Sequence, residues 1–382
     1  MCLLLVSLVA CGGRPDAQTL RADVQRVLDR RAEALLDRDE RALAETGARA
    51  GYDNLRAVPL DGWSYRVKDV RRSGDTVTAD TELRYRVRSV DRAPVTTART
   101  LRLSRDADGR WSVDRDRPAK KSAQQLWDQG AVRVVHGTHS LVLGVGQSRE
   151  TLDRFAGLAD RAVPAVSDAW PTEWSRQVVV LVPGSLEGMA GLLGSPASSY
   201  RGIAAVTTGE TGDRASAPAD RIVVNPDAYG TLGAVGRQVV LTHETTHVAT
   251  RAHTTPATPL WLSEGYADWV GYRGTDRTPR QAAPELAAAV TGGRLPAKLP
   301  EDGDFGFDGD AHALARAYES GWMACRMIAD RWGEERLGAF YRAVGGHGKR
   351  AGAVEDALRR VLGTSPQAFT AAWRDYLRSE FG

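Results

Sequence analysis

The chain has 382 residues, 42% of them hydrophobic, and its 51 Lys and Arg nearly balance its 48 Asp and Glu for a formal charge of +3. This composition is typical of a globular protein, and it gives no indication of nucleic-acid binding. A chain of this length exceeds one typical core, so we expect two domains, divided near the stretch Arg117-Pro118-Ala119-Lys120-Lys121.

The N-terminus holds a short apolar run, Leu3–Ala10, which ends in Leu8-Val9-Ala10-Cys11. This ending resembles a bacterial lipobox. The resemblance implies that residues 1–10 are a signal peptide, that Cys11 becomes the lipidated first residue and that residues 11–18 form a tether. The protein would then be extracytoplasmic and lipid-anchored to the bacterial cell membrane. The alternative is an apolar segment of a soluble protein.

Two further observations concern this region. No basic residue precedes the apolar run, as one normally does in a signal peptide, so we expect translation to begin upstream of Met1. With Cys2 cleaved away and Cys11 lipidated, only Cys325 remains, so no intramolecular disulfide is expected. Cys325 lies in an apolar helical stretch, which predicts a buried thiol.

Residues 19–117 read as one helix followed by strands. The expected elements are a helix over Thr19–Thr46 and strands over Ser64–Val70, Thr76–Val90, Val95–Ser104 and Trp111–Val113. One helix on a curved antiparallel sheet resembles the cone-shaped α+β fold of the nuclear-transport-factor-like domains. No cluster of acids and histidines is present here, so we expect a spacer or binding role, followed by a linker over residues 118–130.

Residues 131–382 begin with alternating strands and helices. Strands are expected over Val132–Val135, Ser140–Leu143, Gln177–Val182, Gly202–Thr208 and Arg221–Asn225, with a helix over Arg149–Trp170. After Gly271 the pattern becomes helical, near residues 279–291, 311–332, 334–344, 351–362 and 366–380. The acidic stretch Glu301–Asp310 lacks the EF-hand pattern and is expected to be a solvated loop and not a calcium site.

The most informative segment is His243-Glu244-Thr245-Thr246-His247, within a helix expected over Thr231–Arg251 with Thr231 as its N-cap. The apolar positions that support this helix are Leu232, Val235, Val239 and Val240. Because residues four apart share a helix face, the two imidazoles can bind one metal ion. Glu244 lies beside them and can act as a base toward a water molecule without being a ligand.

A third ligand is expected at Glu264, in the stretch Trp261-Leu262-Ser263-Glu264-Gly265, since a catalytic zinc usually takes three protein ligands. Thr258 and Pro259 read as the N-cap and first residue of its helix. Asp268, one turn further, could accept the outer N–H of a ligating histidine. The nitrogen and carboxylate set favours Zn²⁺ over magnesium or calcium. His253 is expected in a solvated loop and not as a fourth ligand.

These motifs resemble the gluzincin branch of the zincin metallopeptidases, which includes thermolysin-like enzymes and the aminopeptidase N family. The resemblance covers roughly residues 131–382 and implies an α+β domain in which a mixed sheet and the H-E-x-x-H helix precede a helical C-terminal subdomain. It also implies that Gly202–Thr208 forms the upper wall of the cleft, where an extended peptide could pair with an exposed edge. The alternative is an internal strand that contacts no ligand.

The same resemblance implies a residue that stabilises the oxyanion, and Tyr318 is the first candidate and His312 the second. The alternative for Tyr318 is a tyrosine packed in the helical core. The chain has no G-A-M-E-N stretch of the exopeptidase type, so zinc endopeptidase activity on a peptide or protein substrate is the expectation. The competing hypothesis is a catalytically silent zincin-fold surface lipoprotein that acts as a binding module. The substrate and the oligomeric state stay open.

Overall fold

The computed structural model describes residues 17–209, 217–306 and 310–382. The predicted signal peptide, Cys11 and part of the acidic stretch 301–310 therefore lie outside the described residues. The chain forms two compact units. Of the described residues, the first unit holds 17–53, 60–85 and 96–122, and the second holds 54–59, 86–95, 123–209, 217–306 and 310–382.

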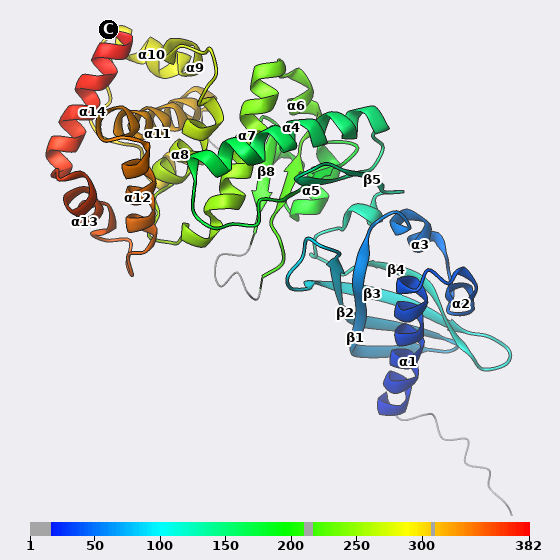
Figure 1. The fold of residues 1–382 in the computed structure, drawn as a ribbon. Coiled ribbons are helices and arrows are strands. Elements are labelled where there is room, and N and C mark those ends of the chain that lie inside the picture. Colours follow the sequence, from blue (N-terminus) through cyan, green and yellow to red (C-terminus); the bar gives the residue numbers. More distant parts are fainter. Residues whose placement is uncertain (1–16, 210–216, 307–309) are drawn as a thin grey trace, which may run out of the picture. The chain divides into compact units, whose positions relative to one another are not determined.

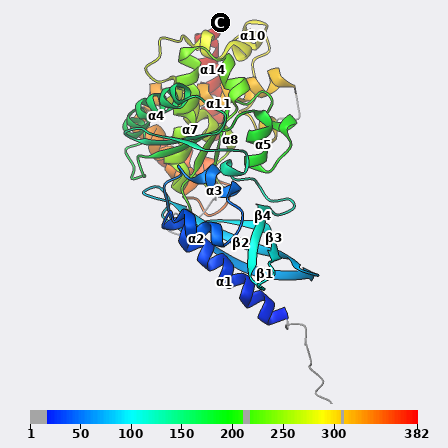
Figure 2. The ribbon, with the colours of Figure 1, turned by 90° about the vertical axis from the view of Figure 1, so that its right-hand side faces the viewer.

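The first unit is a four-stranded sheet with a long helix, α1 (Ala17–Leu36), packed on β1 (Figure 1 and Figure 2). The strands lie side by side in chain order and are β1 (Leu60–Ser73), β2 (Thr76–Val87), β3 (Val95–Arg105) and β4 (Trp111–Pro118). Burial alternates along β2, as expected where one face of a sheet is covered. The nuclear-transport-factor-like fold of this unit stays a prediction.

The helix predicted over Thr19–Thr46 is wrong in its second half. The chain breaks after Leu36, where Arg38 has a positive φ of 58°, and a second short helix follows, α2 (Glu40–Glu45). The side chain of Asp39 accepts hydrogen bonds from the backbone N–H groups of Arg41 and Ala42 and so caps this new helix. A local capping aspartate therefore ends the continuous helix that the apolar pattern predicts. A third helix, α3 (Ala50–Leu55), follows.

The second unit is built on a five-stranded mixed sheet in the order β5-β6-β7-β9-β8. Its strands are β5 (Arg133–His136), β6 (Ser140–Gly144), β7 (Val178–Val182), β8 (Ala205–Thr208) and β9 (Arg221–Val224). The three central strands β6, β7 and β9 run parallel, whereas β5 and β8 pair antiparallel with their neighbours. Among the residues that the structure describes, β8 has no strand on its outer side, so it is an edge.

The first helices of this unit lie against the sheet, and the later ones form a separate helical part that ends at the C-terminus (Figure 1). They are α4 (Arg149–Ala169), α5 (Leu186–Leu193), α6 (Pro226–Thr231), α7 (Ala234–Thr250), α8 (Leu260–Tyr272), α9 (Pro279–Ala282), α10 (Pro284–Thr291), α11 (Ala311–Trp332), α12 (Glu334–Gly345), α13 (Ala353–Ala357) and α14 (Pro366–Phe381). The prediction of a mixed α+β fold with a helical C-terminal part is confirmed.

Several predicted helix starts are wrong by a few residues. The helix α7 begins at Ala234 and not after Thr231, because the separate helix α6, capped by the side chain of Asn225, ends at Thr231. The helix α8 begins at Leu260 with Pro259 as its N-cap, one residue later than predicted. The helix expected over residues 279–291 is divided at Ala283 into α9 and α10, each of which begins with a proline.

A pair of glycines sets the distance between α8 and α11. A Cβ atom on Gly321 would lie 2.6 Å from the carbonyl oxygen of Trp261, and a Cβ atom on Gly265 would overlap the backbone of Gly321. The two backbones therefore touch, which no side chain larger than hydrogen would allow. This contact holds α8 against α11 at Gly265, the residue immediately after Glu264.

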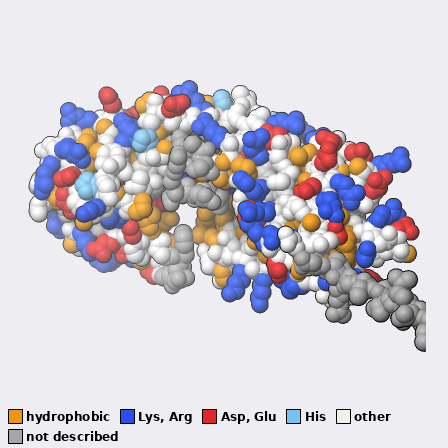
Figure 3. Space-filling view, turned by 90° about the horizontal axis from the view of Figure 1, so that it is seen from below, with side chains coloured by type: hydrophobic (Ala, Val, Ile, Leu, Met, Phe, Trp, Pro, Cys, Tyr) orange, Lys and Arg blue, Asp and Glu red, His pale blue; other side chains and the backbone are white. Residues whose placement is uncertain are grey.

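Asp and Glu side chains are interspersed among Lys and Arg on the face in Figure 3, as the near balance of 51 basic and 48 acidic residues suggests. None of the helices in the described part of the chain combines the length and hydropathy needed to cross a lipid bilayer.

Candidate metal centre

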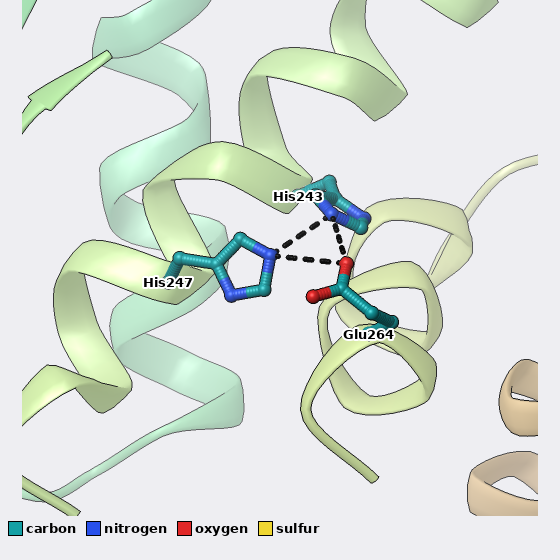
Figure 4. A group of neighbouring side chains, drawn as sticks. All are labelled: His243, His247 and Glu264. Atoms are coloured by element: carbon teal, nitrogen blue, oxygen red, sulfur yellow. Dashed lines mark hydrogen bonds and ion pairs between the residues drawn. The ribbon is translucent and has the colours of Figure 1, made fainter. Parts of the chain in front are cut away.

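Two packed helices, α7 and α8, bring His243, His247 and Glu264 together. The Nε2 atoms of His243 and His247 are 3.0 Å apart. The Oε2 atom of Glu264 lies 3.2 Å from the first and 3.4 Å from the second. Figure 4 shows both imidazoles turned toward this carboxylate. Among the described residues, this is the group whose His and carboxylate ligand atoms lie close enough to hold a metal ion.

The chemistry of this donor set fits a tetrahedral cation such as zinc. Asp268 Oδ1 lies 2.8 Å from His243 Nδ1, so Nδ1 donates to the carboxylate and Nε2 is left with a lone pair. In a neutral imidazole this lone pair faces a second imidazole and a carboxylate, and either a proton or a metal ion can lie between these acceptors. Zinc bonds of roughly 2.0–2.1 Å in tetrahedral geometry separate ligand atoms by about 3.3 Å, close to the spacing seen here.

The buried charges at this centre perturb the pKa values of His243 and of the ligating Glu264. Burial alone would lower the pKa of His243, but the carboxylates of Asp268, Glu264 and Glu244 outweigh it, so the pKa is raised well above its usual range. Burial would likewise raise the pKa of Glu264, yet the facing imidazoles of His247 and His243 hold it far below its usual range. Protons and a metal ion therefore compete for the same atoms.

Glu244 lies on α7 next to the ligands, and its side chain is held from the edge of the sheet. The residue is only 7% exposed. The hydroxyl of Thr207, on β8, donates to Glu244 Oε2 at 2.6 Å and lies 3.0 Å from the Glu244 carbonyl oxygen. A buried carboxylate that accepts one hydroxyl hydrogen bond keeps its other oxygen available to a reacting water. The sequence analysis did not single out Thr207. Its place in the predicted wall strand was the only signal in the sequence that could have indicated it.

Three threonines form the buried face of α7 behind the ligands. Thr245, Thr246 and Thr250 are almost fully buried. Each hydroxyl donates to the backbone carbonyl four residues earlier, at 2.7, 2.8 and 2.9 Å. Each buried hydroxyl is thereby satisfied within its own helix, so a polar stretch can lie against the core without an unmet hydrogen bond.

A cavity of about 990 Å³ opens onto the metal centre. The residues of β8 on its wall include Ala205, Val206 and Thr207, while His243, Glu244, His247 and Glu264 line its inner side. The predicted wall strand thus lies at the cavity, although its regular part begins at Ala205 and not at Gly202. A volume at the upper end of the range for small-ligand pockets, roughly 300–1,000 Å³, leaves room for a peptide segment.

Tyr318, on α11, also lines this cavity. Its ring also packs edge-on against Phe305, with the ring centres 5.2 Å apart. Tyr318 therefore both faces the cavity and packs against a neighbouring aromatic side chain. Burial raises the pKa of its hydroxyl strongly, and the negative charges of Glu264, Asp268 and Glu244 add to the effect. The phenol therefore stays protonated and is a hydrogen-bond donor at the cavity wall.

The other candidates lie away from the centre. His312, the second choice for the oxyanion, has a side chain that is 69% exposed and pairs with Glu285 at 3.1 Å. It is not among the residues that line the cavity. His253 packs against the ring of Trp170 at 5.5 Å and is partly buried, so the expectation of a solvated loop residue is wrong. Cys325 is fully buried, as predicted, and burial raises the pKa of its thiol.

Glu319 is a cavity residue that the sequence analysis did not single out. Its carboxylate accepts hydrogen bonds from the backbone N–H groups of Glu285 at 3.3 Å and Leu286 at 2.5 Å, at the start of α10. Burial raises the pKa of this carboxyl to about 7, despite the opposing effect of the two hydrogen bonds. A titratable group with a near-neutral pKa therefore lies on the same wall as Tyr318.

Comparisons with known proteins find distant likenesses among solved structures. No protein-family model matches the chain, and no curated protein matches it. Among solved structures it is similar to yeast LTA4 hydrolase, with a TM-score of 0.38 and 11% identity, over 73% of this chain and 44% of that one. It is also similar to an M1 zinc metallopeptidase from Deinococcus radiodurans bound to a Tyr-Ser-Ala substrate, with a TM-score of 0.36 and 12% identity, over 84% of this chain and 61% of that one. The chain thus spans less than two thirds of either protein.

Proposed function

We propose that this protein is a zinc-dependent peptidase that cleaves internal peptide bonds. The observation that carries the proposal is the triangle of His243, His247 and Glu264 ligand atoms, 3.0 to 3.4 Å on each side, with the buried carboxylate of Glu244 beside it in a large cavity. Two imidazoles and one carboxylate leave the fourth position of a tetrahedral zinc open, as catalytic sites require.

The residues around this triangle have separable roles. Bound zinc would act as a Lewis acid at the scissile carbonyl and lower the pKa of the attacking water. Asp268 holds the proton of His243 on Nδ1 and so keeps Nε2 free as a ligand atom. Glu244 accepts the proton of the water and passes it to the leaving amine, while Thr207 holds its carboxylate in place.

The remaining cavity residues would bind and polarise the substrate. The protonated hydroxyl of Tyr318 donates a hydrogen bond to the negative charge that develops on the carbonyl oxygen. The edge of β8 offers backbone N–H and C=O groups, with which an extended peptide can pair whatever its side chains. The absence of a G-A-M-E-N stretch favours an endopeptidase over an aminopeptidase.

The test compares wild type with Glu244→Gln, both prepared from Gly12 onward and loaded with zinc, on a complex peptide library read by mass spectrometry. Glu335→Gln, an exposed acid on α12, is the matched control. We expect the same cleavages from wild type and the control and none from Glu244→Gln, although all three bind one zinc. Turnover by Glu244→Gln at the wild-type rate would refute the mechanism. Bound zinc without any cleavage by wild type would favour the silent binding module instead.

We also propose that the protein is anchored by a lipid on Cys11 at the outer face of the bacterial cell membrane. The proposal rests on the stretch Leu8-Val9-Ala10-Cys11 and the apolar run before it. In a bacterial host grown with a labelled fatty acid, wild type and Cys325→Ala should carry the label, and Cys11→Ala should not. Label on Cys11→Ala equal to that on wild type would contradict the anchor.

A further inference from the structure

A second cavity, of about 420 Å³, lies between α4, α6 and α7, and shares no lining residue with the cavity at the metal centre. Its walls come from the faces of these three helices and from the ends of the central strands. Its volume falls within the range of small-molecule sites, roughly 300–1,000 Å³. The proposed peptidase chemistry uses none of the residues that line this second cavity.

The cavity lies where the parallel strands end. Val182 is the last residue of β7, Gln147 follows the end of β6 by three residues, and Pro226 follows β9 by two. These three strands are parallel neighbours, so their carboxyl ends meet at the same edge of the sheet. In open α/β sheets, the crevice outside the carboxyl ends of the strands is the usual place of ligand binding.

The inner wall of this cavity is apolar. Phe155 on α4 and Tyr229 on α6 form a ring pair with centres 4.9 Å apart, and Leu158 lies beside them. The hydroxyl of Tyr229 donates to the carbonyl oxygen of Arg237 at 2.8 Å, so the polar end of this side chain is already satisfied. The ring faces therefore offer a surface for an apolar group.

The rim, by contrast, is positively charged. The described residues that line the cavity include Arg154, Arg161 and Arg237 and no Asp or Glu. Arg154 pairs with Glu150 at 3.1 Å, so the net positive charge comes from Arg161 and Arg237. Arg161 donates from Nε to Gln238 at 3.0 Å, and one terminal nitrogen of Arg237 donates to the Gly230 carbonyl at 2.9 Å. The Nε atom of Arg237 is buried and has no hydrogen-bond partner within residues 17–209, 217–306 and 310–382.

We propose that this cavity binds a small amphipathic carboxylate. The apolar body of the ligand lies against Phe155, Leu158 and Tyr229, and its carboxylate pairs with the guanidinium groups of Arg237 and Arg161. Guanidinium groups bind carboxylates with charge-assisted hydrogen bonds, and both arginines line the cavity. The absence of acidic side chains among the described lining residues disfavours a cationic ligand.

Isothermal titration calorimetry of the full chain tests the proposal with octanoate as the probe, with zinc removed because an open zinc position would itself bind a carboxylate. We expect saturable one-to-one binding of octanoate, and at least about tenfold weaker binding of octan-1-ol and octylamine, because these lack the anionic head group. Arg237→Gln should weaken octanoate binding by at least about tenfold. Arg149→Gln, an exposed arginine of α4 outside the cavity, should leave it unchanged.

Two further variants keep the result decisive. Leu158→Trp fills the apolar part and should abolish binding even if Arg237→Gln fails to fold, and circular dichroism verifies the fold of each variant. Glu244→Gln should bind octanoate as wild type does, so the outcome is independent of the peptidase proposal. Absent or non-saturable binding, equal affinity for octanoate and octan-1-ol, or an unchanged dissociation constant in folded Arg237→Gln or Leu158→Trp would overturn the proposal.

Discussion

Replacing Asp268 by Asn should weaken zinc binding about 10- to 100-fold and leave the fold intact. Asp268 Oδ1 lies 2.8 Å from His243 Nδ1, and the two side chains are only 18% and 12% exposed, so solvent screens their interaction weakly. Asn has the same shape but no charge. Its carboxamide could also present its NH₂ group to Nδ1, which would move the imidazole proton to Nε2, the ligand atom.

These two effects set the range of the expected loss. A hydrogen bond to a charged group stabilises by roughly 1.5–3 kcal/mol and a neutral one by roughly 0.5–1.5 kcal/mol, so loss of the charge alone costs about 1.4 kcal/mol, or tenfold in affinity. A shift of the tautomer adds to this, because the proton on Nε2 must leave before the metal binds. About 2.8 kcal/mol corresponds to the hundredfold limit.

The assay is a titration of metal-free protein with zinc at neutral pH, in competition with a fluorescent chelator. Asp276→Asn, an exposed acid shortly after α8, makes the same change of charge and should bind zinc as wild type does. A dissociation constant for folded Asp268→Asn within about twofold of wild type would show that the carboxylate does not orient His243. An equal loss in Asp276→Asn would assign the effect to net charge.

Three further outcomes are expected. Thr207→Val should lower kcat by about 10- to 100-fold with the zinc affinity unchanged, because the carboxylate of Glu244 loses a hydrogen bond. Thr207→Ser keeps the hydroxyl and should retain most of the wild-type kcat. Equal kcat values for wild type and both variants would refute the role of Thr207 in holding Glu244. Gly321→Ala places a Cβ atom 2.6 Å from the carbonyl oxygen of Trp261 and should lower the free energy of unfolding in urea by about 1–3 kcal/mol, whereas Gly348→Ala, with nothing within 4 Å, should not. The pKa of Glu319 is raised from 4.5 to about 7 in the folded protein. Between these pH values the folded state binds more protons than the unfolded state, so the free energy of unfolding falls as the pH rises from about 4.5 to about 7. Glu319→Gln should remove that part of the slope of unfolding free energy against pH, and an identical slope in both proteins would contradict the raised pKa.

Local periodicity in the sequence determined much of the fold and the placement of the ligands. The separation of four residues puts His243 and His247 on one face of α7 whatever surrounds the helix. Apolar runs and alternation located the five strands of the second unit to within about three residues at each end. The buried thiol of Cys325 was likewise predicted from its apolar helical surroundings. These features depend on neighbours a few positions away, which the sequence displays directly.

Only the tertiary structure decided which distant residues meet. The contact of Thr207 with Glu244 joins residues 37 positions apart, and nothing in either segment specifies it. Tyr318 and His312 lie on one helix within two turns, yet only Tyr318 lines the cavity, because the rotation of α11 against α8 is set by the close approach of Gly265 and Gly321. Such contacts depend on how whole helices and strands pack, and packing is decided by the surfaces of all of them together.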